Sequence, residues 1–154
     1  MKFIIPIIIL SSLFLNACTS NQHVSNSTQS VLNQNQKFVD ELKKGISLYF
    51  NKNSSELDSK YLIYLSTAAE VLNSNPYFIL VLQGHTDSSG SASTNKRIAY
   101  MRANTVRSQL VTQYGVSPEQ VTAEGVGSAN PIASNETADG RALNRRVMAT
   151  LRIK

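Results

Sequence analysis

The chain is poor in the side chains that most often carry chemistry. Its 154 residues include one cysteine, Cys18, two histidines, His23 and His85, and no tryptophan. One cysteine cannot form an intramolecular disulfide. Because His23 lies in a polar N-terminal segment far along the chain from His85, no metal-binding triad of histidine and cysteine can be assembled. No serine stands in a G-x-S-x-G sequence, the turn that presents a nucleophilic serine. These absences argue against a metal centre and against thiol or serine catalysis.

The longest apolar stretch lies at the N-terminus. Met1 and Lys2 precede a run from Phe3 to Leu15 that is interrupted only by one proline and two serines. The run is shorter than the roughly 20 residues that a membrane-spanning helix needs, and it follows a basic residue as a secretory signal does. We expect residues 1–17 to be a signal peptide that is removed. Export excludes nucleic acid as a partner.

The four residues Leu15-Asn16-Ala17-Cys18 resemble the bacterial lipobox, in which the cysteine thiol is acylated, for example with palmitate, and the signal is cut just before it. The resemblance implies that Cys18 is a lipidation site. Thr19, rather than an aspartate, follows it, which resembles default sorting to the outer membrane. We therefore expect a lipid-anchored outer-membrane protein whose domain lies in the periplasm. The alternative is a chance cysteine at the end of an ordinary signal peptide.

Composition divides the rest of the chain in two. Residues 18–36 begin with the expected acylated cysteine and continue with Ser, Asn, Gln and Thr, a composition typical of a flexible tether. Residues 37–154 are expected to form one folded domain. Without Lys2 there are 15 − 1 = 14 basic side chains against 10 acidic ones, about +4, which suits an anionic cell-wall partner.

Apolar periodicity in the expected domain alternates between strand and helix. The pattern predicts helices at 37–44, 58–73 and 94–114 and strands at 46–50, 77–82, 121–123 and 147–153. We expect an α+β fold in which a β-α-β-α-β-β order forms a mixed sheet. The strands that flank each helix would pair in parallel, the last strand would be antiparallel, and the helices would cover one face.

A set of spaced residues in this domain forms an extended motif. Its members are Gly84-His85-Thr86-Asp87, Gly90, Asn95, Ile98, Arg102-Ala103, Val106, Leu110, Gly125, Gly127, Pro131, Gly140-Arg141 and Asn144-Arg145-Arg146-Val147. This set resembles the OmpA-like peptidoglycan-binding domain family, of the peptidoglycan-associated lipoprotein type. The resemblance covers about residues 45–154. Ile98 and Ala99 stand where the family usually has leucine and serine, and we expect repacking there rather than lost binding.

The resemblance implies a function, namely non-covalent binding of peptidoglycan that links the outer membrane to the cell wall. The family binds the diaminopimelate of the stem peptide, whose side chain ends in an ammonium and a carboxylate. Asp87 matches the acid that takes the ammonium, and Arg102 matches the arginine whose planar fork grips the carboxylate. The loop from Thr86 to Gly90 can present backbone N–H groups to the same carboxylate. By the same resemblance, the pocket is lined by Asn53, Asn95 and Arg145.

Three alternatives remain open. Asp87 and Arg102 could form a buried salt bridge with no ligand, while Asn95 only supports the start of a helix. The chain could be an envelope adaptor whose main partner is another periplasmic protein. It could also be a peptidoglycan-processing enzyme, but no pair of acids stands where a sugar-cleaving pair is expected. We therefore expect no catalytic residue, no metal and no cofactor, and we interpret His85 as structural.

Overall fold

The structure is a computed structural model that describes residues 21–154. The expected signal peptide, residues 1–17, and the expected lipidation site, Cys18, lie outside the described residues. Among residues 21–154, no helix is both long enough and apolar enough to cross a membrane.

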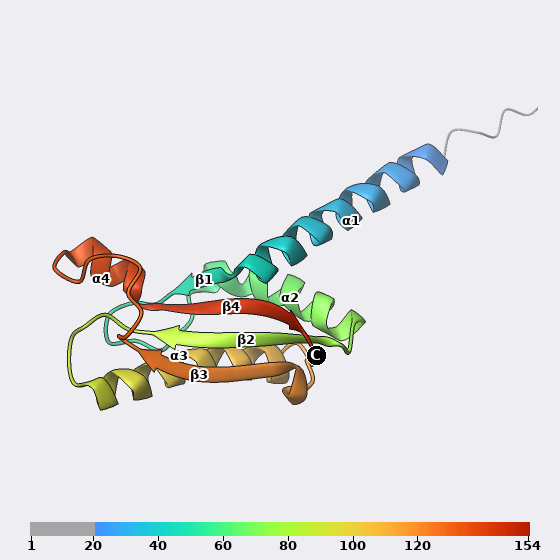
Figure 1. The fold of residues 1–154 in the computed structure, drawn as a ribbon. Helices are drawn as coiled ribbons and strands as arrows, with labels where there is room; N and C mark the ends of the chain where they lie inside the picture. The colour runs from blue at the N-terminus through green and yellow to red at the C-terminus, as the bar shows by residue number, and fades with distance from the viewer. Residues whose placement is uncertain (1–20) are drawn as a thin grey trace, which may run out of the picture. The chain divides into compact units, whose positions relative to one another are not determined.

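The described chain folds into helices and strands in an alternating order (Figure 1). The elements are α1 Asn21–Lys44, β1 Ile46–Tyr49, a 3-10 turn Ser59–Tyr61, α2 Leu62–Ser74, β2 Phe78–His85, α3 Ala92–Thr112, a 3-10 turn Pro118–Gln120, β3 Val121–Gly127, α4 Ala138–Asn144 and β4 Arg146–Ile153. The expected α+β fold and its β-α-β-α-β-β order are confirmed. The short helix α4, inside the loop before the last strand, was not expected.

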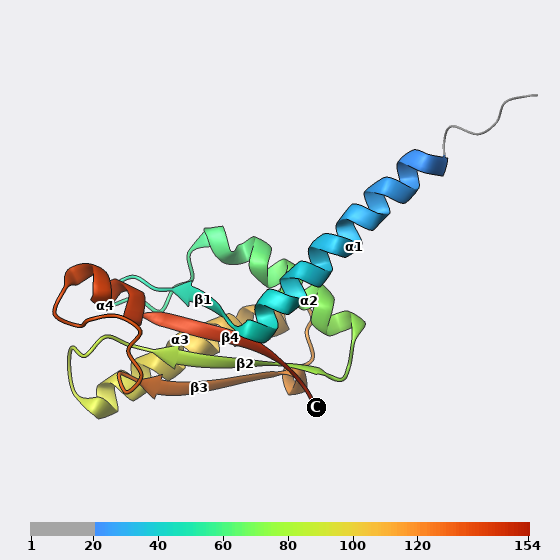
Figure 2. The same cartoon turned by 45° about the horizontal axis from the view of Figure 1, so that its top comes forward.

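The sheet is mixed and has the strand order β1-β4-β2-β3. β2 and β3 pair in parallel on either side of α3, as expected, while β4 pairs antiparallel with both β1 and β2. The expectation that β1 and β2 pair directly was wrong, because β4 lies between them (Figures 1 and 2). From that central position β4 buries Val147, Ala149 and Leu151 at alternate residues, which an edge strand could not do as fully.

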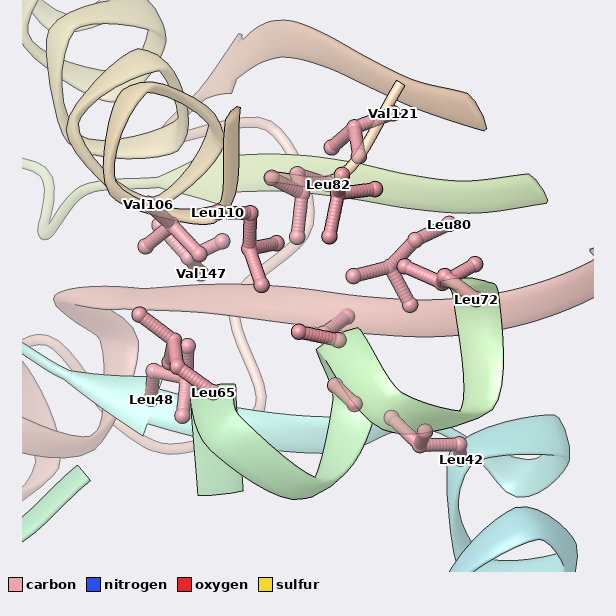
Figure 3. Packing of buried hydrophobic residues seen from close by; sticks show 14 of the residues in the cluster. Leu42, Leu48, Leu65, Leu72, Leu80, Leu82, Val106, Leu110, Val121 and Val147 are labelled. Carbon is pink, nitrogen blue, oxygen red and sulfur yellow. The ribbon is translucent and has the colours of Figure 1, made fainter. Parts of the chain in front are cut away.

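The hydrophobic core lies between the sheet and the helices α2 and α3. Leu80 and Leu82 of β2 meet Leu72 of α2 and Leu110 of α3, all exposed by 1% or less (Figure 3). In α2 and α3 the buried residues recur at helical spacing, so each helix turns one apolar stripe to the sheet. Both helices therefore pack into one cluster, on the expected single face.

Helix α1 is longer than expected. The sequence predicted a helix at 37–44 after a flexible segment, but the structure has helix from Asn21 to Lys44. Residues 19–44 contain neither glycine nor proline, so nothing breaks a helix that propagates backward from its packed end. At that end Leu42 is buried, and Phe38 and Val39 pack against the core. The division into tether and domain stays a prediction.

Two glycines bring α3 close to the sheet. Gly84 on β2 and Gly125 on β3 stand side by side in the parallel register. A Cβ added at Gly84 would lie 1.9 Å from the carbonyl oxygen of Ala99, and one at Gly125 would lie 2.3 Å from that of Lys96. The glycines therefore allow the first half of α3 to lie directly on the C-terminal ends of both strands.

Candidate functional site

A pocket of about 320 Å³ opens at the C-terminal end of β2. Three segments that are distant in sequence form its wall: the turn after β1, the loop after β2 with the first half of α3, and the residue before β4. The six residues predicted for ligand binding all line it, namely Asn53, Thr86, Asp87, Asn95, Arg102 and Arg145. Arg146, the neighbour of Arg145 in the matching motif, is not among the lining residues.

Asp87 is held from two sides. Its Oδ2 lies 3.0 Å from Nη1 of Arg145, and its Oδ1 accepts a hydrogen bond from the backbone N–H of Ser89 at 3.0 Å. Burial raises the pKa of Asp87, but the hydrogen bonds from Ser89 and Arg145 outweigh burial and hold the pKa below its usual value. The carboxylate is therefore ionised at neutral pH and points its charge toward the pocket.

The partner of Asp87 is Arg145, so the expected alternative of an Asp87–Arg102 salt bridge was wrong. Arg145 also donates from Nε to the carbonyl of Phe50 at 3.3 Å. Phe50 directly follows β1, whereas Arg145 directly precedes β4, and these two strands pair in the sheet. Arg145 therefore holds both the end of the β1–β4 pair, through Phe50, and Asp87 in the loop after β2.

Arg102 is buried and bound to backbone carbonyls. Only 2% of it is exposed, and it donates to the carbonyls of Ser54 at 3.0 Å, His85 at 3.3 Å and Asn51 at 3.1 Å. Its guanidinium also lies 5.5 Å from the ring centre of Phe50. Burial, and next the charge of Arg145, lower the pKa of Arg102 to about 10, so it stays charged at neutral pH.

This arrangement leaves part of the donor capacity of Arg102 unused. A guanidinium has five N–H donors, and the three carbonyls do not take all of them. The side chain also ties the turn after β1 to the end of β2, a structural role that the sequence did not reveal. A single sequence position carries no sign of which backbone carbonyls will surround it.

Asn53, Asn95 and Thr86 contribute uncharged polar side chains to the wall of the pocket. Asn53 has a φ of +59°, the left-handed conformation that asparagine tolerates better than most residues. Asn95 is 3% exposed and donates to Oγ of Ser128 at a long 3.5 Å. Thr86 lines the pocket, and its Oγ1 has no hydrogen-bond partner among the described residues. The last two side chains therefore retain hydrogen-bonding capacity.

The loop after β2 uses several of its N–H groups internally. Thr86 N–H donates to Gly127, Ser88 N–H to the side chain of Asn135, and Ser89 N–H to Asp87. The expectation that this loop offers its N–H groups freely to a ligand carboxylate was wrong for these three. Asn144, fully buried, binds Asn135 in turn, so the loop before β4 braces the pocket loop.

His85 lies beside the site without lining the pocket. Burial, and next the charge of Arg146, lower its pKa to about 4, so it is neutral at physiological pH. Among residues 21–154, no group of three or more His, Cys, Asp and Glu side chains is arranged to hold a metal ion.

Sequence reasoning missed seven residues that line the pocket: Lys52, Ser54, Ser55, Ser89, Arg97, Ile98 and Met101. Arg97 and Met101, four residues apart, share a helix face with each other but not with Asn95 and Arg102, and that spacing was the only signal for them. The turn residues had none, since their position depends on how β1 is placed by β4.

The OmpA family model matches residues 49–145, more than half of the chain. Outer membrane protein Omp38 of Acinetobacter baumannii is 36% identical over 118 residues, which cover 77% of this chain and 33% of Omp38. The peptidoglycan-associated lipoprotein of Buchnera aphidicola is 33% identical over 129 residues, covering 81% of this chain and 74% of that protein. The chain spans about a third of the length of the first of these relatives.

A solved structure has the same fold. The crystal structure of the peptidoglycan-associated lipoprotein from Burkholderia pseudomallei superposes with a TM-score of 0.66 at 30% identity, and the match covers 69% of this chain and 89% of that one. The family match spans the pocket from the turn after β1 to Arg145. On the evidence of sequence and fold together, the chain belongs to the OmpA family.

Proposed function

We propose that this chain binds peptidoglycan non-covalently through the diaminopimelate of the stem peptide. The observation that carries the proposal is the pocket in which Asp87, Arg102 and Arg145 come together from three segments. The end of the diaminopimelate side chain is a zwitterion, and a site for it needs an anion and a cation a few ångströms apart. Two similar proteins are named peptidoglycan-associated lipoproteins, which supports peptidoglycan as the partner.

In this proposal the ligand ammonium binds Asp87. The carboxylate of Asp87 has about four lone-pair sites, of which Arg145 and the N–H of Ser89 take two. An ammonium can therefore join without displacing Arg145. The ligand carboxylate binds the N–H donors of Arg102 that the three carbonyls leave over, with the hydroxyl of Thr86 beside it.

We also propose that a lipid on Cys18 anchors the chain in the outer membrane, with the domain in the periplasm. The lipobox-like sequence and the lipoproteins among the similar proteins support this. Replacing Cys18 by serine should release the protein from the outer-membrane fraction, because the thiol is the acceptor of the lipid. A Cys18→Ser protein that stays in that fraction with unchanged mass would contradict the lipid anchor. It would leave the proposed binding of peptidoglycan unaffected.

The binding test is sedimentation with purified sacculi. We expect Asp87→Asn to lower binding by at least about tenfold, since the ammonium would meet a neutral amide in a partly buried site. Asp40→Asn is the matched control: Asp40 is also ion-paired, to Lys43 at 3.7 Å, but it is exposed on α1. That variant should bind like wild type.

Competition identifies the ligand group. Free diaminopimelate should displace the wild-type protein from sacculi, whereas Nα-acetyl-lysine amide, which has the side-chain ammonium but no carboxylate, should compete poorly. Equal competition by both would refute recognition of a zwitterion. If Asp87→Asn sediments fully with sacculi, the pocket is not the site. Retention of the chain on an envelope protein rather than on sacculi would favour the adaptor.

A further inference from the structure

The pocket carries more positive charge than one zwitterion can balance. Its charged lining residues are Lys52, Asp87, Arg97, Arg102 and Arg145, four cations against one anion. The end of diaminopimelate brings one positive and one negative charge, so it leaves that excess unchanged. A concave site with an excess of one sign concentrates ligands of the opposite sign.

Two of the four cations already have a defined partner or role. Arg145 pairs with Asp87, and Arg102 is held by three backbone carbonyls. Lys52 and Arg97 are exposed and form no ion pair within residues 21–154. They are also absent from the six residues predicted for ligand binding, and the zwitterion does not require them.

The structure keeps both side chains near the pocket. Arg97 follows Asn95 on α3, and its Nη1 lies 3.3 Å from Sδ of Met101, so it extends along the pocket side of the helix. Lys52 stands in the turn after β1. Arg102 binds the carbonyls on both sides of Lys52, at Asn51 and Ser54, so the turn that carries the lysine is anchored.

The stem peptide offers an anion of the right kind. Its glutamate is joined to diaminopimelate through the side-chain carboxyl, so its α-carboxylate stays free unless it is amidated. We propose that Lys52 and Arg97 form a second anion position that binds this carboxylate, and that the chain therefore prefers stem peptides with a free glutamate carboxylate over amidated ones. This inference rests on the proposed function and adds a specificity to the same pocket.

Two synthetic tripeptides test the proposal on the protein purified in detergent. One is L-alanyl-γ-D-glutamyl-diaminopimelate, and the other has D-isoglutamine in place of the glutamate. Titration calorimetry should give the wild-type protein about a three- to fivefold lower Kd for the first, the range expected for partly exposed ion pairs. Raising the salt concentration should reduce the preference, because exposed charges are screened.

The variants assign the preference to its residues. In the double variant Lys52→Gln/Arg97→Gln the two Kd values should agree within about 1.5-fold, while the Kd for diaminopimelate alone stays within about twofold of wild type. The matched control is Arg152→Gln/Lys154→Gln, which removes the same charge from exposed positions at the opposite end of the sheet, where Arg152 faces Ile79. It should keep the wild-type preference.

Each outcome decides between the claims. Equal binding of both tripeptides by wild type, or a preference that survives in the Lys52/Arg97 variant, would overturn the second anion position and leave the proposed function standing. Loss of the preference in the control variant would also overturn it, since net charge alone would then account for it. Failure of wild type to bind diaminopimelate or either tripeptide would refute the proposed function, and this inference with it.

Discussion

Replacing Arg102 by alanine tests whether its hydrogen bonds hold the pocket together. The side chain is 2% exposed and serves the carbonyls of Asn51, Ser54 and His85. An unpaired buried carbonyl costs about 1–3 kcal/mol, and this applies to His85, which is itself buried. Asn51 is exposed and Ser54 is partly exposed, so water replaces those two bonds at about 1 kcal/mol or less each.

The sum predicts that Arg102→Ala lowers the free energy of unfolding by about 3 kcal/mol. Residues 33–154 form the compact unit that contains the site. For a unit of this size, 1 kcal/mol shifts Tm by about 3–6 °C, so Tm should fall by about 10–15 °C. The Tm of Arg102→Lys should lie between those of wild type and Arg102→Ala, because an ammonium keeps the charge but cannot reach all three carbonyls.

Thermal unfolding followed by circular dichroism measures the change. Arg97→Ala is the control, an arginine on the same helix that is exposed and bonds no carbonyl. It should shift Tm by less than about 2 °C. An Arg102→Ala protein that melts within about 3 °C of wild type would show that the three bonds contribute little net stability.

Two further predictions concern stability around the site. Gly84→Ala should destabilise the fold by more than about 3 kcal/mol, because its Cβ would lie 1.9 Å from the carbonyl oxygen of Ala99; a urea transition close to that of wild type would contradict the close approach of α3. The pKa of His85 is lowered to about 4 in the folded state, so as pH falls from about 6.5 the unfolded state takes up a proton first and stability decreases. His85→Asn should remove this part of the decrease between pH 6.5 and 4; an unchanged pH profile would show that His85 does not cause it.

Much of the fold could be predicted from local patterns. The two helices over the sheet were visible because α2 and α3 each repeat apolar residues at helical spacing. The predicted strand at 77–82 overlaps β2, and the one at 147–153 falls within β4. What could not be predicted depends on contacts between distant residues. The position of β4 between β1 and β2 is one case, because the sequence of a strand does not show which strands it will pair with.

The N-terminal helix shows a second limit. Composition favoured a coil up to Gln36, because Ser and Asn are weak helix formers and a segment rich in Ser, Asn and Gln supplies little core. The structure continues α1 through these residues from a packed end at Leu42. Once a nucleus is fixed, each added residue gains a backbone hydrogen bond, so a modest propensity alone did not mark where this helix begins.

The residues of the candidate site were predicted, but the ion pair between two of them was not. Asp87, Arg102 and Arg145 all line the pocket, yet the ion pair joins Asp87 to Arg145 rather than to Arg102. The roles of these side chains were predicted from the resemblance to the family. A resemblance identifies residues, but it does not show which hydrogen bonds they form. Arg102 turned out to face carbonyls of the turn after β1, and that turn is placed only when β1 and β4 pair.

The contacts of Arg102 and Arg145 connect the stability of this pocket with its proposed recognition of a ligand. Both arginines bind the backbone after β1, Arg102 at Asn51 and Ser54 and Arg145 at Phe50. The same guanidinium groups face the cavity where a zwitterion is proposed to bind. The choice between a structural and a ligand-binding arginine is therefore not exclusive, and a melting temperature alone cannot separate the two roles. Ligand-dependent stabilisation can separate them, because a ligand that binds only the folded state stabilises it by RT ln(1 + [L]/Kd). Diaminopimelate should therefore raise the Tm of wild type. A destabilised variant that keeps the site should show the same rise in Tm from a lower starting value.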